Sequence, residues 1–477
     1  MKTINYLVLL IMLIINISKA IAFSVPYEAW MGTYMAEQKI GYMSFKISES
    51  DYKNKPGYKI TTVLSTKMNL LGSEIHQLVT TVVYTDKEFM PVKEEFSMSS
   101  GGKTTKVHAV FNEDTIDCVV SAGSGLTKHT IDIPKGATFV GDLMFGITDE
   151  TMEKGKEYTY QYFNPLTLSV DPLTIVIERE EKIQIGGKSY DAIVVKNTTP
   201  TGNMILWQDK NGDLLKAEAV MGIKMIRESK EEAMSNRNIH AKTDIATLTS
   251  AKSSVKINNP RKVKKLEAVI EGLDGEFELL NDDNQRVEFI DDSKTSAKYI
   301  IESYTKETDI GSNSFEEISK EYLSNTAYIN WQTDEVKELS KTITKDKKTN
   351  YEKCSAIREW LFKNIETKTD IGITRSALDV LRSKVGVCRD HAILFAAFAR
   401  AAGVPTKVVS GLIYTNSGFY YHAWAECFDG RWIPFDSTLN SDFVDATHIK
   451  LAEGDATSMF SLSRVIGNLK VNVLHYE

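Results

Sequence analysis

The segment Val385–Ala402 constrains the fold of this chain more than any other stretch. From Ala392 onward it is apolar on every side and interrupted only by Arg400. A helix without a polar face is one that the rest of a domain covers. Gly403 and Pro405 follow in the order typical of the end of a helix. We therefore predict a buried helix here.

Cys388 lies at or just before the first turn of this predicted helix, and Gly386 marks the entry. Unpaired backbone N–H groups and the positive end of the helix dipole meet at such a place. Both favour the thiolate over the thiol and so lower the pKa of a cysteine. The position predicts a reactive Cys388.

The chain of 477 residues is long enough for roughly two to four domains. Its composition, 42% hydrophobic and 25% charged, is ordinary for globular protein. The net charge of −7 argues against nucleic acid as the main partner.

The first 22 residues have the pattern of a signal peptide. Lys2 supplies the positive start, Tyr6–Ile17 the apolar core, and Ala20–Ala22 a small-residue cleavage site. The apolar run is short for a membrane span, although an uncleaved anchor is the alternative. We expect an exported protein, periplasmic or secreted, without a membrane span after removal of the signal.

The chain has four cysteines, too few for a domain built on disulfides. A free thiol in an exported protein risks oxidation, so a retained Cys388 points to a chemical role. A bridge between Cys354 and Cys427 is compatible with the sequence, which does not decide it.

Residues 23–235 are predicted to form an antiparallel all-β domain, either a sandwich or a curved open barrel. Turn signals such as Gly186-Gly187 separate the strands. The clearest predicted strands are Tyr58–Leu64, Ile75–Tyr84, Thr105–Phe111, Glu157–Phe163, Leu173–Arg179 and Ala192–Asn197.

Residues 236–312 combine a polar linker, up to about Pro260, with a small β-rich module. The module is either separate or a flank of the last domain. Its predicted strands are Leu266–Ile270, Phe277–Leu280, Arg286–Ile290 and Tyr299–Ser303.

Residues 313–477 begin with helical periodicity and continue with strands, which predicts an α+β domain. Ser376 is a plausible cap of one short helix. The predicted helices are Phe315–Ser324, Glu335–Thr344, Tyr351–Ile365 and Ser376–Arg382, and the predicted strands are Thr406–Leu412, Phe419–Phe428 and Arg431–Asp436.

Three residues occur in the order that thiol-based acyl transfer needs: Cys388 as nucleophile, His422 on a strand, and Asp436 at the end of the next strand. A thiol needs a base to take its proton, and the base needs an acceptor that holds its tautomer.

The turn between these strands decides whether His422 can meet Asp436. A two-residue loop, Asp429–Gly430, would pair Phe428 with Arg431 and turn Asp436 to the other face of the hairpin. Asp436 could then not orient the imidazole.

A three-residue loop with Gly430 in the left-handed conformation would instead pair Cys427 with Arg431. His422 and Asp436 would then lie directly opposite each other. We predict this loop, with a positive φ at Gly430.

Three motifs resemble the transglutaminase-like superfamily, whose members share a papain-like core. They are Gly386-Val-Cys388-Arg-Asp-His-Ala392, His422-Ala-Trp424-Ala-Glu426 and Arg431-Trp-Ile-Pro-Phe-Asp436-Ser-Thr438. The resemblance covers about the last third of the chain. Ser437 is a departure, because a proline often follows the aspartate in this family. The opening Tyr27–Tyr42 is similar to the β-domain of many exported bacterial members.

The resemblance implies Cys388 as nucleophile, His422 as general base, Asp436 as orienting acid, and a thioester made from an amide substrate. We expect an exported peptidase or amidase, or a protein-glutamine acyltransferase, that acts on protein or peptide and needs no cofactor. A cell-envelope polymer is a further partner to consider. The alternative is a non-catalytic binding or scaffold protein with a vestigial pocket.

A metal site is the rival interpretation of the same motifs, because Cys388, His391, His422 and Cys427 are all soft ligands. His422 and Cys427 lie on opposite faces of one predicted strand, so a tetrahedral site is hard to close around them. We predict no metal ligands.

The other polar residues of the motifs have simpler explanations. Asp390 and His391 are expected to cap and pack the first helical turn, Glu426 to be solvated or hydrogen-bonded, and Cys427 to be core. His448 carries no chemical signal of its own, although similar tails occur in the family.

Trp424 is expected to shield the imidazole or to pack in the core. The oxyanion is expected to bind the Cys388 N–H and one upstream donor, for which Trp360 is a suggestion only.

Overall fold

The computed structural model describes residues 25–35, 37–70, 73–100, 102–122, 125–140, 153–235, 244, 248–303, 320–368, 375–415, 418–441, 443–455 and 458–477. The predicted signal peptide lies outside these residues, and so does 315–319 of the first predicted helix. The rest of that helix was predicted wrongly, because residues 320–323 form a turn. Among the described helices, none has both the length and the apolar character of a membrane span.

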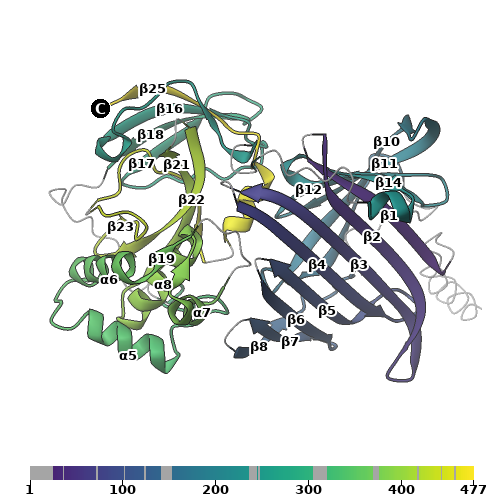
Figure 1. Cartoon of the computed structure of the whole chain (residues 1–477), viewed down its shortest axis with the longest axis horizontal. Helices are drawn as coiled ribbons and strands as arrows, with labels where there is room; N and C mark the ends of the chain where they lie inside the picture. Colours follow the sequence, from purple (N-terminus) through teal and green to yellow (C-terminus); the bar gives the residue numbers. More distant parts are fainter. Residues whose placement is uncertain are drawn as a thin grey trace, which may run out of the picture.

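The N-terminal part is one antiparallel sheet of fourteen strands, in the order β8 to β1 followed by β14 to β9. The sheet is strongly curved (Figure 1). Of the two predicted alternatives, a sandwich or a curved open barrel, the single curved sheet excludes the sandwich. The strands are β1 (Tyr27–Met35), β2 (Gln38–Tyr52), β3 (Lys55–Leu70), β4 (Ser73–Thr85), β5 (Pro91–Ser100), β6 (Lys103–Phe111), β7 (Thr115–Ala122), β8 (Gly125–Asp132), β9 (Glu157–Asn164), β10 (Ser169–Ile185), β11 (Lys188–Thr199), β12 (Gly202–Gln208), β13 (Leu214–Glu218) and β14 (Ile223–Glu228).

The sheet forms because inward-facing residues alternate with outward-facing ones along its strands. Phe45, Ile60 and Leu173 lie in its main hydrophobic cluster and are fully buried. Strands β10 and β11 are joined by a two-residue turn, Gly186–Gly187, in which both residues have positive φ. Glycine suits such a turn because it has no side chain to clash. A short helix, α2 (Lys230–Ala233), follows β14.

A second sheet has five strands in the order β15-β25-β16-β18-β17. Their bounds are β15 (Lys252–Ser253), β16 (Lys265–Glu271), β17 (Gln285–Phe289), β18 (Ser296–Glu302) and β25 (Lys470–Tyr476). Because β25 comes from the end of the chain, this sheet joins the small β-rich module to the last domain. The strand predicted at Phe277–Leu280 was wrong: this segment is irregular, and the Leu280 carbonyl accepts a hydrogen bond from the Gln285 side chain.

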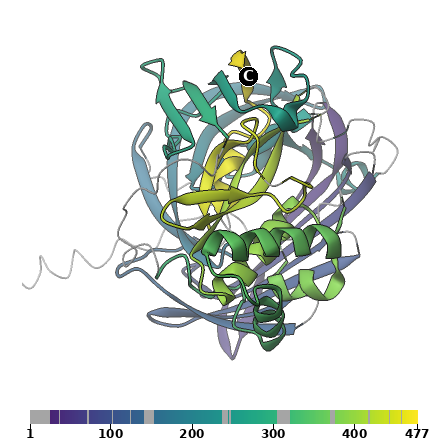
Figure 2. The same cartoon turned by 90° about the vertical axis from the view of Figure 1, so that its left-hand side faces the viewer.

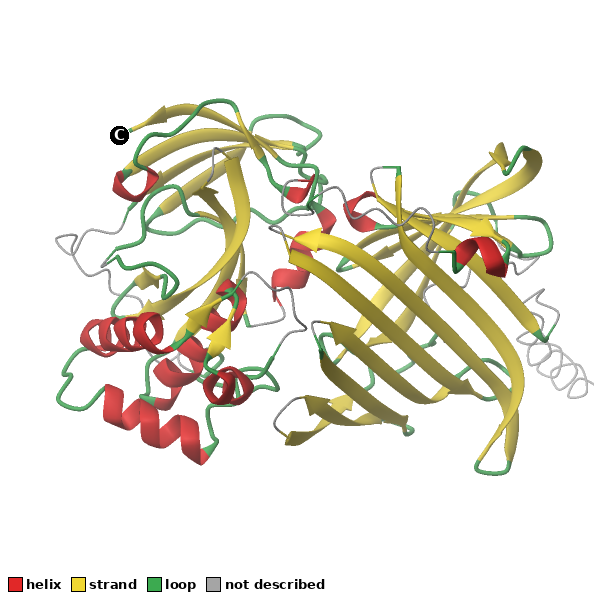
Figure 3. Cartoon of the chain, in the orientation of Figure 1, coloured by secondary structure: helices red, strands yellow, loops and turns green. Residues whose placement is uncertain are grey.

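The remaining C-terminal part combines helices with a four-stranded antiparallel sheet, in the order β23-β22-β21-β24. The helices gather at one end of this part (Figures 2 and 3). Their bounds are α5 (Asp334–Ile343), α6 (Asn350–Asn364), α7 (Ala377–Ser383) and α8 (Cys388–Ala401); the strands are β19 (Glu366–Thr367), β20 (Val385–Gly386), β21 (Thr406–Thr415), β22 (Gly418–Phe428), β23 (Trp432–Phe435) and β24 (Ile449–Gly454).

Helix α8 is the centre of this domain, as its apolar sequence predicted. Every residue of 392–399 is buried, and the helix contacts α5, α6, α7, β21 and β22. Arg400, the single charge in the apolar stretch, donates hydrogen bonds to the carbonyls of Thr406 and Ser324. Ser376 caps α7 by accepting from the Asp379 N–H, also as predicted.

The two halves of the chain are in direct contact. Tyr420, on β22, packs against Met35, Ile40 and Ile75 of the large sheet. The Tyr328 hydroxyl donates to the Leu166 carbonyl at 2.8 Å. The short 3-10 helix η4 (Ser458–Arg464) lies between the halves (Figure 1).

Candidate active site

The nucleophile candidate, Cys388, is the first residue of α8 and is partly exposed. The turn before it is held by Asp390, whose carboxylate accepts from the Val387 N–H at 3.1 Å and pairs with Arg375 at 2.5 Å. Gly386 allows this close approach, because a Cβ there would lie 2.9 Å from the Cβ of Asp390. The first turn therefore has a fixed shape around the sulfur.

Strand β22 brings His422 to the sulfur. The Cys388 thiol hydrogen-bonds with the His422 imidazole and with the backbone N–H of Ala423. Burial alone would raise the pKa of the thiol, but the hydrogen bond and the charge of His422 outweigh it, so the pKa of Cys388 is lowered. The geometry thus favours a thiolate.

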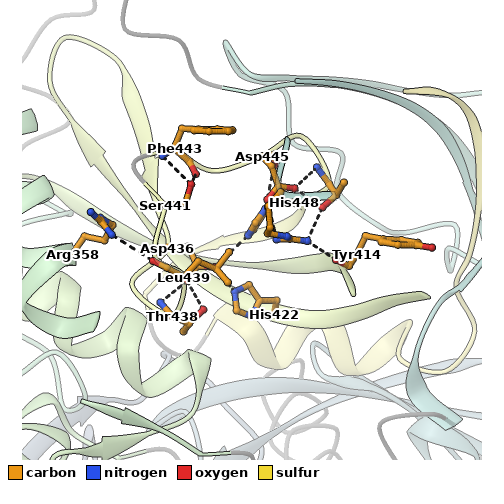
Figure 4. A network of polar contacts seen from close by, with 12 residues as sticks. Arg358, Tyr414, His422, Asp436, Thr438, Leu439, Ser441, Phe443, Asp445 and His448 are labelled. Atoms are coloured by element: carbon orange, nitrogen blue, oxygen red, sulfur yellow. Dashed lines mark hydrogen bonds and ion pairs between the residues drawn. The ribbon is translucent and has the colours of Figure 1, made fainter. Parts of the chain in front are cut away.

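Asp436 is the third member of the group. His422 Nε2 lies 2.8 Å from Asp436 Oδ2. Thr438 donates from its backbone N–H and its hydroxyl to the other carboxylate oxygen, at 2.8 and 2.7 Å (Figure 4). The carboxylate is buried, and hydrogen bonds to both of its oxygens fix its orientation.

The hairpin that joins β22 to β23 has the predicted three-residue loop, and Gly430 has a φ of +82°. The predicted register was wrong by two residues, because Cys427 pairs with Ile433. Phe428 pairs with Trp432, rather than Cys427 with Arg431, so Arg431 belongs to the loop.

Asp436 consequently lies just beyond β23 and is not directly opposite His422. A shift of both loop ends by one residue preserves the face on which each side chain lies, because side chains alternate along a strand. His422 and Asp436 therefore remain on one face, and the carboxylate reaches the imidazole diagonally.

Charge within this buried group shifts the pKa values in opposite directions. Burial alone would lower the pKa of His422, but the Asp436 carboxylate and the Cys388 sulfur raise it to about 10. Burial alone would raise the pKa of Asp436, but His422 and His448 hold it well below its usual range. These shifts favour an imidazolium at His422 beside the Asp436 carboxylate, and they favour the thiolate form of Cys388.

Residues 337–437 match the model of the transglutaminase-like superfamily. The C-terminal α+β part of this chain contains a transglutaminase-like domain. Residues 29–226, in the large sheet, match a second family model, described as a protein of unknown function, DUF3108.

Three solved structures are distantly similar. A candidate cysteine protease from Cytophaga hutchinsonii is 20% identical, with a TM-score of 0.30, over 45% of this chain and 86% of that chain. A β-barrel-like protein with domain DUF1849 from Brucella abortus is 14% identical, with a TM-score of 0.33, over 43% and 96%. A candidate protease from Parabacteroides distasonis is 11% identical, with a TM-score of 0.21, over 82% and 70%. No curated protein matches the chain.

The other motif residues of the transglutaminase-like domain are mostly structural. Asp390 caps the first turn of α8, and His391 is buried with Nε2 3.2 Å from the Thr367 hydroxyl. Cys427 is core, as predicted. Glu426 was expected to be either solvated or hydrogen-bonded. It is buried and pairs with Lys450 at 2.7 Å.

Two tryptophans near the site have different surroundings. The ring of Trp424 stacks beside His422 with the centroids 6.3 Å apart, which fits the expected shielding of the imidazole. Trp360 contacts the ring of Phe398, at 5.4 Å between centroids. Phe398 lies roughly 15 Å along α8 from Cys388, given a rise of ~1.5 Å per residue. The Trp360 ring also lies under the ammonium of Lys384, at 4.5 Å, so its suggested role as oxyanion donor stays a prediction.

The described residues contain two groups whose spacing could suit a metal ion. In Asp282, Glu426 and Glu453, the ammonium of Lys450 already pairs with all three carboxylates. In His422, Asp436 and His448, the carboxylate already accepts from both imidazoles. Neither group is the set that the sequence suggested, Cys388, His391, His422 and Cys427. Of that set, Cys427 lies in the hydrophobic core.

His448 is the residue of this site that the sequence did not single out. It is buried against Asp436, with 3.3 Å between Nε2 and Oδ2, although it lies twelve residues further along the chain. Its only sequence signal is the similar tail in other family members, because spacing alone does not predict the contact.

Proposed function

We propose that this chain is a cysteine-dependent enzyme that breaks an amide bond through a thioester on Cys388, with His422 as acid and base and Asp436 as the residue that orients it. The observation that supports the proposal is the unbroken contact from sulfur to imidazole to carboxylate. A nucleophile, a base and an orienting acceptor in this order are what acyl transfer requires.

In the first half of the proposed reaction, the thiolate of Cys388 attacks the amide carbonyl carbon and a carbon–sulfur bond forms. The carbonyl oxygen becomes an oxyanion near the Cys388 backbone N–H, which has no acceptor within the helix because it belongs to the first turn. The carbon–nitrogen bond then breaks, and the leaving amine takes a proton from the His422 imidazolium.

In the second half, neutral His422 accepts a proton from the incoming nucleophile, which attacks the thioester. The carbon–sulfur bond breaks, and Cys388 and His422 return to the thiolate–imidazolium pair. Water as nucleophile releases an acid and makes the enzyme a peptidase or amidase. A lysine amine forms a new amide and makes it a cross-linking enzyme.

The proposed location is outside the cytoplasm, in the periplasm or secreted. The signal-like residues 1–22 support it. A protein or peptide is the proposed substrate, and the large N-terminal sheet, which packs directly on the transglutaminase-like domain, would position it or dock the enzyme at the cell envelope. Fractionation of cells that produce the full chain, followed by N-terminal sequencing, tests the location; an uncleaved chain in the cytosol contradicts it.

Alkylation by iodoacetamide tests the nucleophile without a known substrate. Cys388 should react well below the pH that a free cysteine needs, and His422→Ala should remove this advantage. His475→Ala, an exposed histidine on β25, is the matched control and should react like wild type. Equal, slow labelling of wild type and His422→Ala would favour the non-catalytic scaffold.

Product analysis separates the two reactions. Incubation with a peptide library and a labelled primary amine should yield new amino termini for a hydrolase, or incorporated amine for a transferase. Cys388→Ser must yield neither.

A further inference from the structure

His448 lies on the segment between β23 and β24 and is 4% exposed. Its Nε2 faces Asp436 Oδ2 at 3.3 Å. Its Nδ1 faces Asp445, at 3.1 Å from the carbonyl oxygen and 3.4 Å from the carboxylate (Figure 4). Carbonyl and carboxylate oxygens only accept, so both ring nitrogens must donate. This geometry favours the imidazolium form of His448.

Two carboxylates flank this imidazolium. Asp436 and Asp445 are the two anions, while His422 and Arg261 are the other cations in contact with them. The ring of Trp424 closes the remaining side, edge to face at 5.3 Å between centroids. A buried cation is tolerated only when such partners offset its lost hydration. Burial alone would lower the pKa of His448, but the two carboxylates raise it.

Asp436 is fixed by four donated hydrogen bonds, and His448 supplies one of them. Thr438 provides two to Oδ1, whereas His422 and His448 share Oδ2. Without His448, the catalytic imidazole would be the one hydrogen-bond partner of Oδ2 among the residues that the structure describes. A carboxylate that can rotate no longer keeps His422 in one tautomer and one orientation.

We propose that His448 is a positioning residue that acts on the reaction only through Asp436, and this inference rests on the proposed function of Cys388. The contact extends one step further, because Arg261 pairs with Asp445 at 2.9 Å. Arg261 belongs to η3 (Pro260–Lys262), which leads into the five-stranded sheet, and the Ala446 N–H donates to the Val263 carbonyl. The small β-rich module thereby supports Asp436 through Arg261, Asp445 and His448.

The test compares iodoacetamide alkylation rates of the full-length chain with its His448→Ala, Asp436→Ala and doubly substituted variants. His448→Ala should lower the rate at neutral pH by roughly 10- to 100-fold, the range for residues that orient another functional group. In the Asp436→Ala background the same substitution should change the rate less than about twofold, because residues that act as a unit are not additive. Thermal unfolding is measured in parallel.

Lys450→Gln is the matched control, since it also removes a buried cation beside β22. Lys450 pairs with Glu426 and not with Asp436. The control variant should lower the melting temperature and leave alkylation near the wild-type rate. His448→Gln, which can keep one hydrogen bond to Asp436 without the charge, provides a readable variant if the alanine variant does not fold. Its alkylation rate should lie between those of wild type and His448→Ala. If His448→Ala does not fold, the rate of His448→Gln should still be below that of wild type.

Wild-type rates in His448→Ala, or additive losses in the double variant, would overturn the inference. A wild-type Cys388 that reacts no faster than a free cysteine would instead refute the proposed function itself. The two failures are therefore distinguishable.

Discussion

The Nε2 of His422 lies 2.8 Å from Oδ2 of Asp436, although the two residues are not partners in the β22–β23 ladder. The contact depends on the side chain of Asp436 reaching back from the residue after β23. It is also what raises the pKa of His422 most strongly against its burial. The first prediction follows from this contact.

Asp436→Asn should lower turnover, and with it alkylation of Cys388 at neutral pH, because the amide cannot stabilise the imidazolium. A loss of roughly 10²- to 10⁴-fold in turnover is expected for an orienting aspartate. The pKa of His422, followed by NMR of its ring protons, should fall from about 10. Asp282→Asn, in the separate cluster around Lys450, is the control and should leave both quantities unchanged.

The pH dependence should separate the two roles of His422. Alkylation needs only the thiolate, so its rate should rise through the lowered pKa of Cys388 and then stay high. Turnover also needs a proton for the leaving amine, so it should fall again as the pH passes about 10, where His422 loses its proton. An alkaline limb in both profiles, or in neither, would contradict His422 as the proton donor.

The same pKa values predict how stability changes with pH. The pKa of His422 is raised above its ordinary value of 6.5, so its contribution is complete below pH 6.5 and is lost as the pH rises through about 10. The pKa of Asp436 is lowered from 3.8, so its contribution is present above pH 3.8 and is lost as the pH falls further. Urea unfolding of wild type and His422→Gln across this range measures the first effect; parallel curves from pH 6 to 11 would contradict it.

Helix α8 could be predicted because local rules determine it. The same holds for the face of the β22–β23 hairpin on which each side chain lies. The apolar run of α8 permits only burial, and a loop that contains Gly430 at positive φ fixes which face each side chain takes. The exact register could not be predicted, because it depends on tertiary contacts of Phe428. Its N–H donates to the Pro405 carbonyl, and its ring packs on Trp432.

The role of the small β-rich module could not be predicted either. Its sheet is completed by β25, which lies far away in the sequence, and its link to the reacting group passes through Arg261 and Asp445. These contacts join residues separated by more than a hundred positions, whereas periodicity and spacing report only on neighbours. The catalytic roles of Cys388, His422 and Asp436 remain predictions that the experiments above test.

Cys354 on α6 and Cys427 on β22 should form a disulfide when the protein is exported. Their sulfurs lie 2.6 Å apart in the hydrophobic core, and a bridge would close a long loop between helix and sheet. Such a crosslink stabilises by roughly 2–4 kcal/mol. Mass spectrometry of the chain from an oxidising compartment should show the loss of two hydrogen atoms relative to the reduced chain.

The double variant Cys354→Ser/Cys427→Ser should melt at a lower temperature than the oxidised wild type. Because neither sulfur contacts Cys388 or His422, its alkylation at Cys388 should be unchanged. Cys118→Ser, in the large N-terminal sheet, is the control for removal of a buried thiol. Recovery of all four cysteines as free thiols after export would refute the bridge.

Arg375 and Asp390 form an ion pair at the turn that carries Cys388. Both side chains are buried, their atoms lie 2.5 Å apart, and Arg375 also donates to the Val385 carbonyl. Arg375→Met would leave the buried carboxylate, in the first turn of α8, with only the more distant Arg389 as a charged partner, at 4.0 Å. Removal of one partner from a buried pair costs about 3–5 kcal/mol, and the remaining negative charge should raise the pKa of Cys388.

Urea unfolding and the pH profile of alkylation measure these two effects separately. Adding Asp390→Asn to Arg375→Met removes the remaining negative charge, so the double variant should recover part of the stability and return the alkylation profile toward low pH. Arg382→Met, which breaks an exposed pair with Glu335, should change the free energy of unfolding by no more than about 1 kcal/mol. If Arg375→Met unfolds and alkylates like Arg382→Met, the pair does not fix the turn that carries the nucleophile.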